Sequence, residues 1–234
     1  MIFVLLGDDL IESLSRKKTA DAEAIVENDL NEEATSSKPG PDEAAVGNDV
    51  NVNVNVNGEV KTPKTIQYWL MKAEPESRIE KGVDVKFSID DLKAKTEPEG
   101  WDGVRNPVAR NNMRAMRKGD LAFFYHSNCK TPGIVGVMRI VEEHQVDESA
   151  FDPAHPYYDP KSTRDKPKWE LVKVEFVKKF DTIVDLKQLK SFAGPGGALE
   201  NMQTLKQSRL SVSGVQPHEW RFILDQLGEQ HDFD

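Results

Sequence analysis

Tyr68-Trp-Leu-Met71 is a short run of apolar and aromatic residues, and this composition is typical of a buried strand. Strand-like patterns return downstream in residues 121–125, 133–141 and 171–180, the last of which alternates apolar with polar side chains along most of its length. Helical patterns are interspersed among these strands without a regular alternation. The sequence therefore predicts an α+β fold.

Start signals mark the expected helices. Ser88 stands at an N-cap position before two aspartates, and Pro107 stands at the first position of a second helix. In that second helix Val108, Met113 and Met116 are expected to form an inward apolar stripe. Three further helical patterns close the chain, at residues 185–191, 199–205 and 217–227. The long connection 147–167 is of a length that is usually functional or disordered.

The acidic residues are unevenly distributed along the chain. Of the net charge of −9, residues 1–65 contribute −7, from 6 basic and 13 acidic residues, and residues 66–234 contribute −2, from 25 and 27. The first segment contains no Trp or Tyr, so it has too little apolar surface to offset the entropy lost on ordering. We expect a disordered acidic tail over 1–65, open to protein partners, and one domain over 66–230.

Several classes of protein are disfavoured by the sequence. The apolar run 2–6 is far shorter than the roughly 20 residues of a spanning helix. The single cysteine, Cys129, excludes an internal disulfide and any zinc site with two or more thiolates. The glycine-rich phosphate loop of nucleotide hydrolases does not occur in the sequence. We expect no membrane partner, no bound metal and no cofactor.

Aromatic, amide and basic residues gather at the expected strand ends and loops, where binding sites are usually built. Trp69 and Trp220 lie in apolar patterns and are expected in the core. The residues expected to form a pocket are Lys72, Glu74, Trp101, Asn106, Tyr125, His126, Ser127, Trp169 and Ser211.

A group of arginines near the second helix forms either a solvated surface or a phosphate-contacting face. Its members are Arg105, Arg110, Arg114 and Arg117. Glu74 and His126 are residue types suited to general acid and base catalysis, but the sequence offers no evident nucleophile beside them. Catalysis is therefore the weaker alternative.

Six motifs occur in order along the chain and carry a resemblance to a known family. They are Trp69–Pro75, Trp101–Asn111, Lys118–Asp120, Phe124–Ser127, Gly133–Gly136 and Arg209–Val212. Together they resemble an EVE domain, close to the thymocyte nuclear protein family, over about residues 67–228. The resemblance implies a PUA-like fold, which is a small bent β-barrel flanked by short helices. It also implies a nuclear location and a pocket for a modified base in nucleic acid.

A base inside a duplex must leave the stack to be read, at a few kcal/mol, and stacking on aromatic side chains contributes about 1–3 kcal/mol per base. We expect Trp101 or Tyr125 to supply that surface, with Trp169 as a second wall. Asn106 and Ser127 are expected to meet the Watson–Crick edge. The sequence thus predicts a non-catalytic, monomeric reader of DNA or RNA, with a modified cytosine favoured.

Two other functions remain open. One is an enzyme that acts on a modified nucleobase or small metabolite in the same pocket, and the other is a protein-interaction module with a vestigial pocket. If the protein reads a modified base, its domain, with a net charge of −2, cannot present a broad cationic surface to nucleic acid. We therefore expect few phosphate contacts and a shallow dependence of affinity on salt.

Overall fold

The structure, a computed structural model, describes residues 65–231 and 233. Residues 1–64 of the predicted acidic tail lie outside this range, so its disorder and its protein partners stay predictions. In chain order the elements are β1 (Tyr68–Ala73), β2 (Ile79–Glu80), β3 (Val83–Asp84), α1 (Ile89–Lys93), β4 (Glu99–Gly100), α2 (Pro107–Ala115), β5 (Leu121–His126), β6 (Gly133–Val146), the 3₁₀ helix η1 (Glu148–Phe151), β7 (Glu170–Asp185), α3 (Leu186–Ser191), α4 (Gln203–Lys206), β8 (Val212–Val215) and α5 (Pro217–Leu227).

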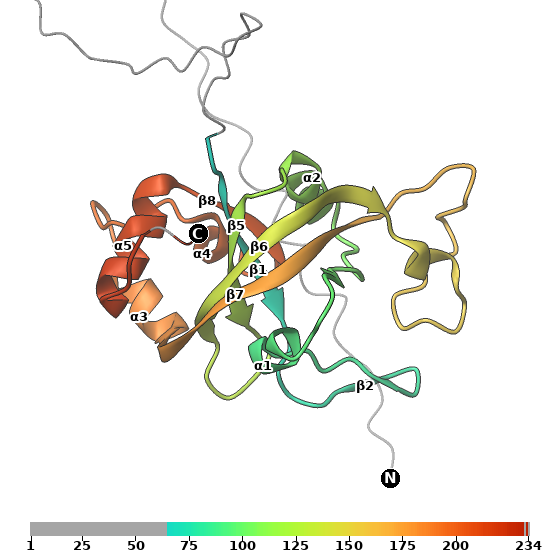
Figure 1. The fold of residues 1–234 in the computed structure, drawn as a ribbon, viewed down its shortest axis with the longest axis horizontal. Helices are drawn as coiled ribbons and strands as arrows, with labels where there is room; N and C mark the ends of the chain where they lie inside the picture. The colour runs from blue at the N-terminus through green and yellow to red at the C-terminus, as the bar shows by residue number, and fades with distance from the viewer. Residues whose placement is uncertain (1–64, 232, 234) are drawn as a thin grey trace, which may run out of the picture. The chain divides into compact units, whose positions relative to one another are not determined.

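One six-stranded sheet organises the fold, in the order β4-β7-β6-β5-β1-β8. The neighbours β1 and β5 are parallel, and every other pair of neighbours is antiparallel. The two longest strands, β6 and β7, run diagonally across the molecule (Figure 1), and their pairing is interrupted by four register shifts. Such irregularities bend and twist strands, so this pair can curve through the whole domain. β2 and β3 form a separate hairpin.

The central strands are buried on both faces. Along β1, Trp69 and Met71 belong to one apolar cluster, and Leu70 belongs to the other. Along β5, Phe124 belongs to the first cluster and Phe123 to the second. Successive side chains of a strand point to opposite faces of the sheet. A strand that lies between two cores therefore needs an unbroken run of apolar residues. This explains why the sequence of β5 has no polar residue before its last position.

Different helices cover the two faces. α1 and α2 contribute Ile89 and Met113 to the first cluster, while α3 and α5 contribute Leu189 and Trp220 to the second. Figure 1 shows α3 and α5 together at the left of the sheet, away from α1 and α2. The Trp220 ring stacks on Phe123 with their centroids 4.0 Å apart. No helix in the described part of the chain has the length and apolar character needed to cross a membrane.

The expected α+β class is confirmed, and Trp69 and Trp220 are core residues as predicted. α5 has the predicted bounds, whereas β6 and β7 extend beyond theirs and the predicted helix over 199–205 is limited to α4. The predicted stripe on α2 is wrong at Val108, which is 46% exposed. Ala109 takes its place, because residues 109, 113 and 116 follow the i, i+4, i+7 spacing of one helix face.

Gly136 marks a close approach between β6 and β7. A Cβ atom added there would lie 2.3 Å from the carbonyl oxygen of Lys178, which is backbone and cannot easily yield. We expect Gly136→Ala to lower the free energy of unfolding by about 1–3 kcal/mol through overpacking. Urea denaturation followed by tryptophan fluorescence measures this change.

Gly214 in β8 is the matched control, because the nearest atom to an added Cβ is Gln203 Oε1 at 3.8 Å. Gly214→Ala is expected to change the free energy of unfolding by less than about 0.5 kcal/mol. Equal losses in the two variants would contradict the close approach at Gly136.

Candidate functional site

A cavity of about 550 Å³ lies where β1 ends. Its walls come from the end of β1, the β2–β3 hairpin, β4 with the segment after it, the loop that contains Tyr157, and the turn before β8. Five of the predicted pocket residues line this cavity. They are Lys72, Glu74, Trp101, Ser127 and Ser211. The structure thus brings together residues that are up to 139 positions apart in the sequence.

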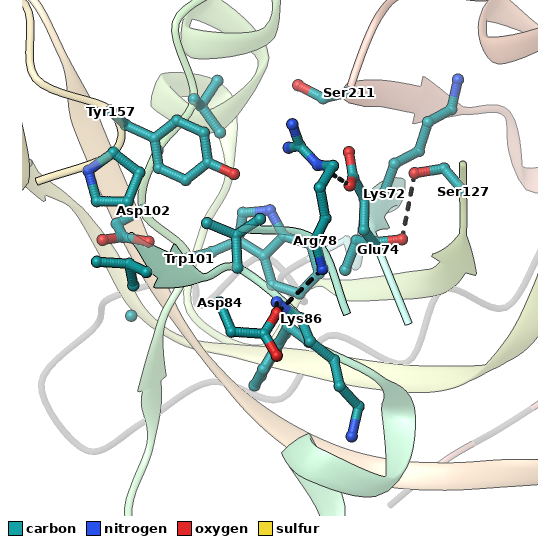
Figure 2. A pocket seen from close by; sticks show the side chains of 18 of the residues that line it. Lys72, Glu74, Arg78, Asp84, Lys86, Trp101, Asp102, Ser127, Tyr157 and Ser211 are labelled. Atoms are coloured by element: carbon teal, nitrogen blue, oxygen red, sulfur yellow. Dashed lines mark hydrogen bonds and ion pairs between the residues drawn. The ribbon is translucent and has the colours of Figure 1, made fainter. Parts of the chain in front are cut away.

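Trp101 is fixed firmly at the edge of the core. Its side chain is 7% exposed, and its ring meets Phe124 and Phe87 edge-on, with centroids 5.4 and 6.0 Å away. Its backbone N–H donates to Val172 O at 2.8 Å. In the view of Figure 2, Tyr157 lies to one side of Trp101, and Arg78 lies to the other. Trp101 therefore contributes a rigid aromatic edge to the cavity.

Tyr157 provides a second aromatic surface that the sequence analysis missed. It belongs to the connection 147–167, whose unusual length was the only signal of its involvement. Gly103 makes its position possible, because Gly103 has φ +73° and an added Cβ would lie 2.5 Å from the Tyr157 ring. Burial raises the pKa of the Tyr157 hydroxyl above its ordinary value. Tyr157 is therefore neutral at physiological pH and can donate a hydrogen bond.

Arg105 anchors the loop that carries Tyr157. Its Nε donates to Tyr157 O at 2.6 Å, its Nη1 donates to Asp147 Oδ2 at 2.7 Å, and its Nη2 donates to Ser149 Oγ at 3.0 Å. The Asp147 carboxylate is fully buried and also accepts from the Gly103 N–H at 3.0 Å. Burial alone would raise the pKa of Asp147, but hydrogen bonds from Ser149 and Arg105 outweigh it and lower the pKa.

The other three arginines of the predicted phosphate-contacting face also have partners within the protein. Arg110 donates to Lys168 O at 2.9 Å and lies over the Trp169 ring. Arg114 forms three hydrogen bonds of 2.6–2.9 Å with Glu170. Arg117 donates to the backbone carbonyls of residues 114 and 116. A phosphate would have to compete with these partners, and the predicted phosphate contacts stay a prediction.

Two predicted pocket residues have roles in the architecture instead. The Asn106 side chain is the N-cap of α2 and accepts from the N–H groups of Val108 and Ala109 at 2.8 and 3.1 Å. Tyr125 is 4% exposed and belongs to the second core, because its parity in β5 is opposite to that of Phe124. Burial raises the pKa of Tyr125 to about 12. Neither residue lines the cavity.

The remaining two predicted pocket residues also lie outside the cavity lining. Trp169 Nε1 donates to Asp159 Oδ2 at 2.7 Å, and both Arg105 and Arg110 lie over its ring. His126 ends β5, and its Nε2 accepts from the Ile89 N–H at 3.1 Å, at the start of α1. Glu74 lines the cavity, whereas His126 does not.

The polar groups of the cavity differ in their charge environments. Glu74 accepts from Arg78 Nε at 2.6 Å, and Arg78 also pairs with Glu80. Burial raises the pKa of Asp102, and the neighbouring Asp147 raises it further. Burial lowers the pKa of Lys72, which donates from Nζ to Ser208 O at 2.9 Å. The cavity therefore combines aromatic surfaces with both donors and acceptors.

These features define a small α+β domain that carries a polar and aromatic cavity. The loop that contains Tyr157 forms one wall of this cavity. The EVE domain model matches residues 67–226, and the chain belongs to this family. The predicted EVE membership and PUA-like fold are confirmed.

The curated relatives include thymocyte nuclear protein 1 from several vertebrates. The protein of Homo sapiens is 51% identical over 162 residues, which cover 67% of this chain and 72% of the relative. The protein of Danio rerio is 44% identical over 219 residues, which cover 91% and 93%. Among solved structures, human THYN1 protein in complex with 5-methylcytosine containing DNA has a TM-score of 0.68 and 49% identity, and the match covers 70% of this chain and 99% of that chain.

Arg105→Met tests the anchor of the Tyr157 loop. The substitution keeps an apolar stem but leaves the buried Asp147 carboxylate without its counter-charge, so we expect a loss of about 3 kcal/mol in the free energy of unfolding. Urea denaturation at neutral pH measures it. Adding Asp147→Asn to the variant should recover part of that loss.

Arg117→Met is the control for this experiment, because the Arg117 side chain is 48% exposed. Its expected loss is within about 0.5 kcal/mol. If Arg105→Met were no more destabilising than Arg117→Met, Arg105 would not be the anchor of the loop.

His126 predicts a dependence of stability on pH. Burial lowers its pKa from the ordinary 6.5, so the unfolded chain binds a proton more readily than the folded protein does. The stability contributed by neutral His126 is complete above about pH 6.5 and is lost as the pH falls from there through the folded-state pKa. Protonation would also remove the acceptor of the Ile89 N–H.

His126→Gln supplies a side-chain oxygen as acceptor and does not titrate. We expect the wild type to lose free energy of unfolding relative to this variant between about pH 7.5 and about pH 5.5. Urea denaturation at several pH values measures the difference. A difference that stays constant over this range would rule out His126 as the titrating group.

Proposed function

We propose that this protein is a non-catalytic reader of DNA that carries a modified base, with a cytosine modified at its 5-position favoured, and that it acts in the nucleus. The observation that carries the proposal is the similarity to human THYN1 protein, whose structure contains 5-methylcytosine DNA, over 99% of that chain. The name of the curated relatives supports the nuclear location.

The cavity supports this proposal through its size and its walls. A volume of about 550 Å³ is in the range of small-molecule sites and exceeds what one nucleobase needs. In the proposed complex the everted base lies against Tyr157 and the edge of Trp101. Stacking of this kind contributes about 1–3 kcal/mol per base, which offsets the few kcal/mol needed to leave the duplex.

The polar groups would fix the orientation of the base. Ser127 and Ser211 present hydroxyl groups, and Asp102 presents a carboxyl group whose pKa is raised by burial. Burial of one methyl group contributes about 0.8 kcal/mol, or roughly a fourfold preference. A substituent that forms a hydrogen bond permits stronger discrimination, since its loss leaves buried partners unsatisfied.

The partners of Glu74 and His126 favour binding over catalysis, because His126 Nε2 already accepts from the Ile89 N–H. The two residues that the sequence offered as general acid and base do not share the cavity, and Glu74 is held by Arg78. A proton relay between them would need direct hydrogen-bond reach or a single bridging water. This arrangement supports a reader rather than an enzyme that acts on the base.

The test is a binding panel of short single- and double-stranded DNA and RNA oligonucleotides that differ in one modified base. Fluorescence anisotropy should give a preference for 5-substituted cytosine in DNA, and mass spectrometry should detect no change in the oligonucleotide. Tyr157→Leu should weaken binding of the preferred oligonucleotide by roughly fivefold or more, because a stacking surface is lost.

Tyr158→Leu is the matched control, since Tyr158 is adjacent in the chain but does not line the cavity. It should retain the affinity of the wild type. Equal affinities for modified and unmodified oligonucleotides in the wild type would overturn the proposed function. A change in oligonucleotide mass would instead identify an enzyme.

A further inference from the structure

The cationic side chains around the cavity fall into two groups. Arg78 pairs with Glu74 and Glu80, and Lys86 lies 3.8 Å from Asp91. By contrast, neither Lys72 nor Arg209 has a carboxylate within 4.0 Å among residues 65–231 and 233. Both of these residues line the cavity. The two lining cations without a carboxylate partner among the described residues belong to the end of β1 and to the turn before β8.

Lys72 is a partly desolvated cation. Its side chain donates from Nζ to Ser208 O at 2.9 Å and lies over the Tyr125 ring, 5.6 Å from its centroid. An ammonium group has three N–H donors, and the carbonyl takes one of them. The lowered pKa of Lys72 reflects the unfavourable burial of this charge, which an anion in the cavity would relieve.

The backbone places Arg209 beside Lys72. The Lys72 N–H donates to Ser211 O at 2.9 Å, and its Nζ holds Ser208 O, so Lys72 binds the chain on either side of Arg209. Arg209 is exposed, and the hydroxyl-bearing residues Ser208 and Ser211 line the same wall. One β1 residue thus fixes the turn that presents the second cation.

We propose that Lys72 and Arg209 form an anion subsite that binds a backbone phosphate next to the everted nucleotide. This inference rests on the proposed function, because the base in the cavity brings its own phosphates to the rim. Lysine supplies a compact charge and arginine a planar fork, and both bind phosphate oxygens. The arginines of α2 are less suited to this role, because Glu170 and backbone carbonyls already occupy them.

The subsite also accounts for the expected shallow salt dependence. Each neutralised phosphate contributes about 0.9 to the slope of log affinity against log salt concentration for duplex DNA. Two cations on one or two phosphates give a slope of at most about −2, far smaller than that of proteins with broad cationic faces. Arg209→Gln and Lys72→Met should each reduce the magnitude of the slope by up to about 0.9.

The decisive experiment combines these variants with a neutral linkage. In a duplex with one modified cytosine, the phosphodiesters that flank this base are replaced one at a time by methylphosphonate, and affinity is measured by anisotropy. One of the replacements should weaken wild-type binding roughly three- to tenfold and should have little further effect in Arg209→Gln. Such non-additivity indicates that the cation and the phosphate interact.

Arg221→Gln and Lys190→Met are the controls, because each removes one exposed cation from α5 or α3, outside the cavity lining. They should retain both the slope and the full effect of the neutral linkage. If Lys72→Met and Arg209→Gln also behave in this way, the subsite is overturned. Circular dichroism and the urea midpoint establish that every variant is folded.

The two proposals can fail separately. If the wild type does not prefer a modified base but the neutral linkage and the two cation variants act on the same contact, the proposed function fails and the subsite stands. If the preference is present and the variants leave the slope unchanged, only the subsite fails. Absence of binding to every oligonucleotide would overturn both.

Discussion

Burial of β1 and β5 on both faces is the constraint on which the rest of the structure depends. Since Trp69 and Phe124 face one core while Leu70 and Phe123 face the other, neither strand carries a charged side chain before its last two positions. Unpaired polar groups inside such a sheet would be costly. The functional groups are therefore confined to the strand ends and to the connections that follow them, and this is where the cavity lies.

The wall opposite β1 must be held in another way, because it belongs to a loop. Tyr157 lies in a connection and not in a strand of the sheet. Its position depends on Arg105, on Asp147 and on the absence of a side chain at Gly103. A buried ion pair is weak support for stability in general, but its geometry is specific. Here that specificity fixes the backbone of one aromatic residue relative to another, so the cavity has a defined width between Tyr157 and Trp101.

The sequence was sufficient for features that local chemistry determines. Ser88 and Pro107 mark helix starts correctly, and alternation or continuous apolar character identifies β1, β5, β6 and β7. The prediction that Tyr125 lies in the pocket conflicts with strand parity, which, applied from Phe124, places Tyr125 on the other face. Because parity is a local property, the sequence alone contains this information.

The remaining differences arise from contacts between distant parts of the chain. No local pattern indicates that Tyr157 approaches Gly103 or that Trp169 is engaged by Asp159. Nor does one indicate that two of the predicted phosphate-contacting arginines are paired with carboxylates within the protein. Such contacts depend on how β6 and β7 bend and on where their connection returns. The sequence therefore predicts five of the residues that line the cavity. It does not predict that the loop with Tyr157 forms another of its walls.

Neutralisation of these arginines has a consequence for selectivity. When a protein binds nucleic acid through many phosphates, the contribution common to all sequences is large, and a preference of a few kcal/mol acts against that background. In this domain Arg105 and Arg114 are paired with Asp147 and Glu170, which would keep that common contribution small in the proposed complex with DNA. In the proposed complex, stacking and hydrogen bonds inside the cavity would then form a larger share of the binding free energy. A reader that must distinguish a modified base from an abundant unmodified one benefits from this balance, since every unmodified site competes through the phosphate contacts alone.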